Sequence, residues 1–382
     1  MKGHNIFSAL YRNELEKLWA HRGRTLVIAF LVMVLGGTFL VYHAQQASQS
    51  AVRQSIAFQK AQVVQLKNQV RHATGTEKQT LQSQLQQEQQ SIYQMEHQTN
   101  TVNVKQQIQG LESGLQKTPV AFKGETLESL ALDRYMVAHG LSHYNNQTEN
   151  GFRIVGELFG GTAMLLFALL AVGISGDRIS SEMEGGTWGV LLLHAPQRVK
   201  VYLAKLVAAL TMMWGFMMAS AIGFFAAVSV ALGVGSAMVP HVVGLRLTVR
   251  PGTVPPQLTV PVQPFHILPQ WSYDLIALAL AMLAIGGLIA IAVALSMLTR
   301  STVFSLIVGA VLVLSMVLAH VAGPMAIVDP ALHLPLMGDW TGSLAMQYDM
   351  IGMTLRNGVI VLMLWVMAAV SFGVWSARRL DV

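Results

Sequence analysis

One segment of this chain, residues 176–205, places charged residues between two long apolar stretches. The segment begins with acidic residues, continues through two adjacent glycines and a short amphipathic run, and ends with a proline followed by basic residues. This order is typical of a helix-turn-helix at a membrane surface that acts as a rigid lever on the next helix. Ordinary solvated charge is the alternative interpretation of the acidic residues. The residues proposed for this coupling role are Glu182, Glu184, Gly186, Thr187, Pro196 and Arg198.

Three residues within the apolar stretches are candidates for lining a transport pathway. Glu157 follows Arg153 by four residues, so an ion pair across one helical turn is one explanation and a buried acid facing a pathway is the other. Met213 and Met217 belong to a methionine-rich stretch. Flexible thioethers suit either helix packing or a permissive apolar pathway.

The sequence lacks the residue patterns of the common enzyme classes. It has no G-x-x-x-x-G-K-[ST] phosphate loop, no H-E-x-x-H zinc motif and no G-x-S-x-G nucleophile motif. It contains no cysteine, which excludes disulfide bonds and thiolate metal sites. We therefore expect no catalytic residue, no metal and no cofactor in this chain.

The elements that position these residues are expected to be membrane helices. Of 382 residues, 53% are hydrophobic and only 12% are charged, and the mean hydropathy is +0.48, which excludes an ordinary soluble enzyme. A helix needs about 20 apolar residues to cross a bilayer. The sequence therefore predicts an all-α polytopic membrane protein with six transmembrane helices, at residues 25–42, 152–175, 206–239, 275–299, 301–322 and 357–377.

The distribution of positive charge predicts the orientation of these helices. With the N-terminus inside, 12 lysines and arginines lie in cytoplasmic segments and only 3 lie in the two short outer loops. Because positive residues favour the cytoplasmic side, both termini are expected there, with residues 378–382 as a cytoplasmic tail. The net charge of +6 is explained by this asymmetry, so no nucleic-acid partner is predicted.

The segments outside the predicted spans differ in character. Residues 1–24 are expected to form an amphipathic helix at the cytoplasmic interface, as an anchor or as a docking site for a partner. Residues 176–205 form the cytoplasmic coupling loop. Residues 240–274 form a proline-rich outer loop with a short strand or extended cap, and residues 323–356 suit re-entrant or interfacial half-helices packed against protein.

The largest outer segment, residues 43–151, is rich in glutamine, with 20 glutamines between residues 44 and 110. A heptad pattern of apolar residues accompanies them and is broken near Gly75. The pattern predicts a coiled-coil hairpin of two antiparallel helices, each about 25–30 residues and about 40 Å long, that projects from the membrane. A partly disordered low-complexity loop is the alternative.

The coupling loop resembles that of permease subunits of ABC transporters of the ABC-2 type, and the predicted topology resembles theirs too. The proline lies one position later here than in the family pattern. The resemblance implies an exporter in a bacterial-type cell membrane, embedded in the lipid bilayer, whose loop packs into a groove on a separate ABC ATP-binding subunit that holds ATP and Mg. It also implies a dimer with a second permease copy or a paralogue. The matching residues are Glu184, Gly186, Thr187, Leu191, Leu192, Leu193, Pro196, Arg198 and Lys205.

Two other classes of function compete with this interpretation. A membrane-anchored sensor or scaffold would use the outer hairpin to bind a partner, without transport. A secondary transporter would carry paired charges near the middle of the membrane and internal repeats, and the sequence shows neither.

Overall fold

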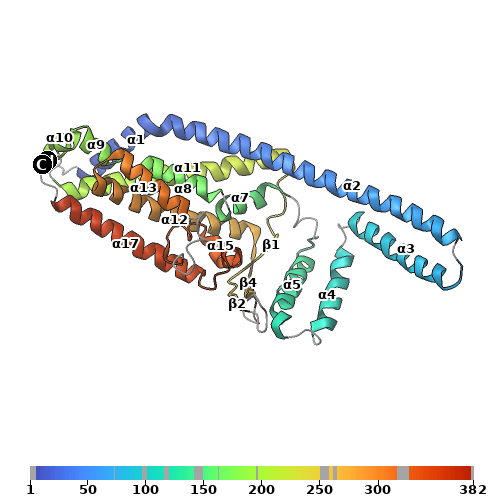
Figure 1. The fold of residues 1–382 in the computed structure, drawn as a ribbon. Coiled ribbons are helices and arrows are strands. Elements are labelled where there is room, and N and C mark those ends of the chain that lie inside the picture. The colour runs from blue at the N-terminus through green and yellow to red at the C-terminus, as the bar shows by residue number, and fades with distance from the viewer. Residues whose placement is uncertain are drawn as a thin grey trace.

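The computed structural model describes residues 6–72, 74–96, 101–115, 120–141, 149–161, 163–194, 197–249, 258–260, 265–315 and 327–379. These residues are mostly helical, and the long helices pack side by side into a bundle (Figure 1). The helices are α1 (Ile6–Leu31), α2 (Gly37–His72), α3 (Gly75–Glu96), α4 (Thr101–Leu115), α5 (Val120–Ala138), α7 (Gly151–Gly160), α8 (Met164–Ser175), α9 (Ser180–Glu184), α10 (Thr187–His194), α11 (Arg198–Leu232), α12 (Gln270–Thr299), α13 (Thr302–Leu314), α15 (Leu336–Thr341), α16 (Ser343–Tyr348) and α17 (Leu355–Arg379).

Five helical stretches of the described chain are long and apolar enough to cross a membrane: Ile6–His72, Met164–Glu184, Arg198–Leu232, Gln270–Thr299 and Leu355–Arg379. The sixth predicted span, residues 301–322, begins as α13, which has 13 residues. Residues 316–322 of that prediction lie outside the described residues. The described residues therefore carry five spans of sufficient length, and the predicted count of six stays a prediction.

The N-terminal part of the chain forms one continuous helix where the sequence predicts an interfacial helix, a span and a stalk helix. A π-helical turn, Val32–Gly36, joins α1 to α2 without a break, so the helix runs from Ile6 to His72. No proline occurs in this stretch, so nothing interrupts the backbone hydrogen bonds. The first part of this helix packs along α11 instead of lying apart from the bundle.

The second predicted span, residues 152–175, is two helices instead of one. Gly160 ends α7, and Gly161 adopts an extended conformation before α8 begins at Met164. A Cβ atom at Gly161 would lie 2.9 Å from the carbonyl oxygen of Glu157, so glycine is needed at this break. The apolar composition of the segment hid the break, because hydropathy does not register backbone conformation.

Helix α12 lies at the centre of the bundle and contacts α7, α8, α11, α13 and α17. Small side chains on α12, among them Ala277, Ala281 and Ala284, are almost fully buried and let neighbouring helices approach closely. By contrast, apolar side chains on α1 and α2, including Ile28 and Leu40, are exposed, as expected for a surface that faces lipid.

The proline-rich segment forms two short antiparallel sheets at one end of the bundle. Strand β1 (Pro240–Val243) pairs with β4 (His266–Pro269), and β2 (Thr248–Val249) pairs with β3 (Leu258–Thr259). The short helices α15 and α16 lie nearby, and α15 contacts β1, α12 and α17. Helix α3 packs against α2, and α4 packs against α5, beyond this end of the bundle (Figure 1).

Candidate functional site

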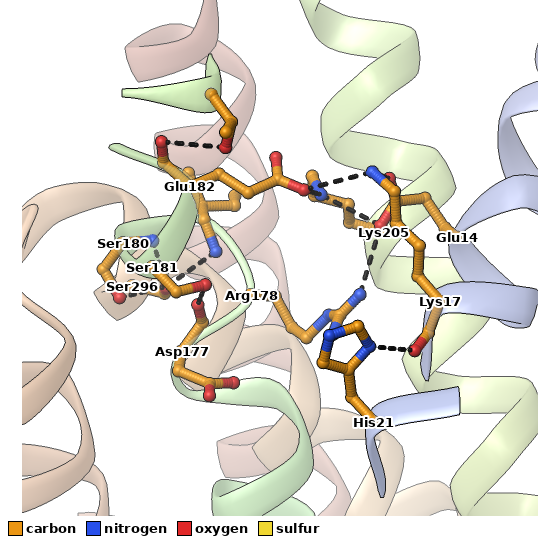
Figure 2. A network of polar contacts seen from close by, with 12 residues as sticks. Glu14, Lys17, His21, Asp177, Arg178, Ser180, Ser181, Glu182, Lys205 and Ser296 are labelled. Carbon is orange, nitrogen blue, oxygen red and sulfur yellow. Dashed lines mark hydrogen bonds and ion pairs between the residues drawn. The ribbon is translucent and has the colours of Figure 1, made fainter. Parts of the chain in front are cut away.

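At the opposite end of the bundle, buried charged residues from α1, the 176–205 segment and α11 meet in one network (Figure 2). We call this end of the molecule the network end. Glu14 of α1 and Lys205 of α11 are almost fully buried, with side-chain exposures of 1% and 0%. A buried charge is stable only when it is paired, so these two residues require each other.

Glu14 and Glu182 together hold three cations. The Nζ atom of Lys205 lies 2.9 Å from Glu14 Oε2 and 2.7 Å from Glu182 Oε1. Arg178 donates from Nη2 to Glu14 Oε2 at 3.1 Å. Lys17 bridges the same carboxylates, with Nζ 3.4 Å from Glu14 and 3.5 Å from Glu182. The loop is thus fastened to both α1 and α11 by ion pairs.

A second set of contacts fastens the loop to α12 and α13. The backbone N–H groups of Ile179 and Ser180 donate to Ser296 Oγ at 3.0 and 2.9 Å. Ser305 of α13 donates to the carbonyl oxygen of Gly176. Arg22 of α1 pairs with Asp177. Movement of this loop would therefore displace four helices of the bundle together.

Four of the predicted coupling residues lie at or beside the turn between α9 and α10: Glu182 and Glu184 in α9, and Gly186 and Thr187 at the turn. Gly186 has φ +67, a conformation that favours glycine, and it directs the chain from α9 into α10. Thr187 donates from Oγ1 to the carbonyl oxygen of Glu182 at 3.3 Å. Glu184 accepts a hydrogen bond from the Thr302 backbone N–H at 3.0 Å and so caps the start of α13. Pro196 lies outside the described residues.

Two charged residues of the 176–205 segment, Glu182 and Lys205, are paired inside the molecule. Glu182 faces Lys205 and Lys17 inside the molecule, with 17% of its side chain exposed, so it is part of the network. Lys205, which the family pattern places at the opening of the next span, is buried. Arg198 is the first residue of α11 and lines a small pocket with Lys200 and Arg378.

The predicted pathway residues are not gathered around one cavity. Glu157 pairs with Arg153, with Oε1 3.0 Å from Nε, as the simpler of the two sequence interpretations predicts. Met213 and Met217 are fully buried by neighbouring helices. A groove of about 730 Å³ runs between α1 and α11, but its methionine is Met212. The pathway role of Glu157, Met213 and Met217 stays a prediction.

Sequence reasoning missed Glu14 and did not connect Lys17 and Arg178 to any partner. One signal was available, because Lys205 directly precedes a long apolar run and a lysine at such a position needs a carboxylate. The sequence does not show which carboxylate folds against it, since Glu14 is 191 residues away. Among the described residues, no group of acidic or histidine side chains has the geometry to hold a metal ion.

The bundle and its ion-paired loop define a multi-pass membrane protein in which a short loop is mechanically joined to the membrane helices. Residues 9–335 match the family model of the ABC-2 family transporter proteins, and the chain belongs to that family. It is accordingly a transport permease. No curated protein and no solved structure matches the chain.

Proposed function

We propose that this chain is the permease subunit of an ATP-driven exporter and that α9 and α10 dock on a separate ABC ATP-binding subunit. The observation that carries the proposal is the network joining Glu182 to Lys205 and Glu14. A loop that only connected two spans would not need buried ion pairs to two other helices, α1 and α11, because burial of charge is costly. A loop that transmits force does need such connections.

In the proposed mechanism, the partner subunit holds ATP and Mg, and its closure pushes on α9 and α10. Arg178 and Glu182 pass the displacement to α1 and α11 through Glu14 and Lys205. The bond from Thr302 to Glu184 passes it to α13. Because α11 and α13 both contact α12, a shift of the loop changes how the bundle packs.

Helix α10 has the surface that a partner subunit would cover. Val190 is 56% exposed, and because α10 lies outside the membrane spans, this apolar side chain does not face lipid. Trp188 on the same helix is buried against the bundle. An exposed apolar side chain between two charged segments suits the centre of a protein contact. Trp188 holds the helix in place, and Val190 is presented outward.

The first prediction concerns this surface. Val190→Asp is expected to abolish co-purification of the ATP-binding subunit with the tagged full-length chain, because it places an unpaired charge in the contact. The measurements are mass spectrometry and ATP hydrolysis of the material eluted from source membranes. Val64→Asp on α2, where the valine is 58% exposed, is the matched control and should retain the partner. Equal behaviour of the two variants would contradict the docking proposal and favour a sensor or scaffold without transport.

The proposed orientation places the network end and both termini in the cytoplasm of a bacterial-type cell, with α3, α4 and α5 outside. A second permease copy or a paralogue completes the proposed dimer. The charge asymmetry of 12 against 3 lysines and arginines supports the orientation.

The second prediction tests the orientation. Since the chain has no cysteine, a single introduced cysteine reports its own position without background. Gln87→Cys on α3 is expected to react with a membrane-impermeant maleimide in intact cells. Arg300→Cys, between α12 and α13, is expected to react only after the membrane is opened. The reverse pattern would invert the proposed topology.

A further inference from the structure

A basic pocket lies at the network end, apart from the ion-pair network. Its volume is about 430 Å³, and it is formed by the start of α11 and the end of α17. The two helices also pack against each other at this level, where Gly373 of α17 lies against the buried ring of Tyr202. The residues that line the pocket are Gln197, Arg198, Val199, Lys200 and Arg378.

The positive charges of this pocket are not neutralised by the described part of the chain. Lys205 and Arg178 have carboxylate partners within 3.1 Å. Arg198, Lys200 and Arg378 have no ion pair with any described residue, and no carboxylate lines the pocket. The positive end of the α11 helix dipole adds to the same field. Three cations that line one pocket with no acid from the described residues favour an anionic ligand.

The position of Trp375 indicates the depth of the pocket in the membrane. Trp375 is 48% exposed, and it lies one turn before Arg378 on α17. Arg379 stacks on its ring, with the guanidinium carbon 4.4 Å from the ring centroid. Exposed tryptophans at the ends of membrane helices lie at the level of the lipid headgroups. The pocket is therefore at the depth where lipid phosphates are found.

We propose that Arg198, Lys200 and Arg378 bind the phosphate of an anionic lipid headgroup. Basic pockets between membrane helices are suited to such headgroups, and each cation near the surface strengthens binding of an anionic lipid by about fivefold. A zwitterionic lipid carries its own cation, which cancels much of this gain. The bound lipid headgroup would hold the start of α11 and the end of α17 together.

Native mass spectrometry of the full-length chain in detergent tests the proposal. The added probes are dioctanoylphosphatidylglycerol, dioctanoylphosphatidylcholine and inorganic phosphate. The double variant Lys200→Gln with Arg378→Gln keeps Arg198, which is a predicted coupling residue. It is expected to bind phosphatidylglycerol about 25-fold more weakly than the unaltered chain. The matched control, Arg12→Gln with Arg24→Gln, removes the same charge from α1 and should bind within about twofold of the unaltered chain.

Each other outcome would overturn the proposal. If the double variant binds phosphatidylglycerol as the control does, or if phosphatidylcholine binds equally well, the pocket is no anionic lipid site. If inorganic phosphate displaces the lipid at equal concentration, the pocket binds free anions and is not a lipid site. If lipid binding is unchanged but the double variant loses a co-purifying protein, the surface belongs to that protein.

Discussion

Replacing Glu14 with glutamine is expected to cost about 3–5 kcal/mol of stability, because it removes the shared partner of three cations. Lys205 and Arg178 would then lie buried side by side with only Glu182 to neutralise them. Glutamine keeps the size of the side chain, so the loss reports charge and not a cavity. The measurement is the thermal unfolding midpoint of the purified chain in detergent, followed by tryptophan fluorescence.

Two further variants separate this effect from general damage to α1. Glu16→Gln removes a carboxylate two residues away that pairs with Arg12 at the surface, and it should change the midpoint little. Adding Lys205→Met to Glu14→Gln removes a buried cation together with its partner and should recover part of the loss. A double variant less stable than Glu14→Gln alone would contradict the proposed pairing.

A valine at Gly358 is expected to separate α17 from a buried histidine–aspartate pair near α15. A Cβ atom there would lie 2.4 Å from Asp339 Oδ2 and 3.0 Å from His333 Nδ1. His333 and Asp339 are fully buried and 2.7 Å apart. Burial opposes protonation of His333, but its hydrogen bond to the Asp339 carboxylate, the negative charge of Asp339 and its hydrogen bond to the carbonyl oxygen of Ile327 together outweigh burial and raise the pKa of His333. Overpacking alone costs about 1–3 kcal/mol, and disrupting a buried charged pair adds to that.

Gly173→Val is the control for this prediction, since a Cβ atom at Gly173 would meet nothing within 4 Å. Both variants place valine in a membrane helix, so they share the same change in helix propensity. The Gly358 variant should unfold at a clearly lower temperature, and the Gly173 variant should resemble the unaltered chain. Equal midpoints would show that α17 does not pack on the pair as described.

The sequence was sufficient for elements whose composition alone decides their structure. Residues 206–239 and 275–299 are so apolar that the presence of α11 and α12 could be predicted, and α12 ends at Thr299 as predicted, but α11 begins eight residues and ends seven residues before its predicted bounds, and α12 begins five residues earlier. Gly75 could also be identified as a break, and α2 ends at His72 with Gly75 at φ +65. These features depend on residues that are close together in the sequence, so a single sequence is enough to predict them.

The sequence was insufficient where structure depends on residues far apart or on backbone geometry. The extended conformation of Gly161, which divides the second predicted span, is invisible to hydropathy. Glu14 lies within the predicted interfacial helix, and only folding brings it to Lys205. The sequence likewise predicts a coupling role for Glu182 but not its ion pair with Lys205, which depends on the fold.

The continuous helix from Ile6 to His72 has a consequence for communication across the membrane. At about 1.5 Å per residue its 67 residues span about 100 Å, so one continuous helix joins the ion pairs of Glu14 to the contact between α2 and α3. The π-helical turn at Val32–Gly36 is the natural pivot, because its backbone hydrogen bonds already depart from the α-helical pattern. The arm beyond the pivot, Gly37–His72, is about 54 Å long. A tilt of about 5° at this pivot would move His72 by about 5 Å, so a small displacement of α1 becomes a large sweep of the glutamine-rich helices.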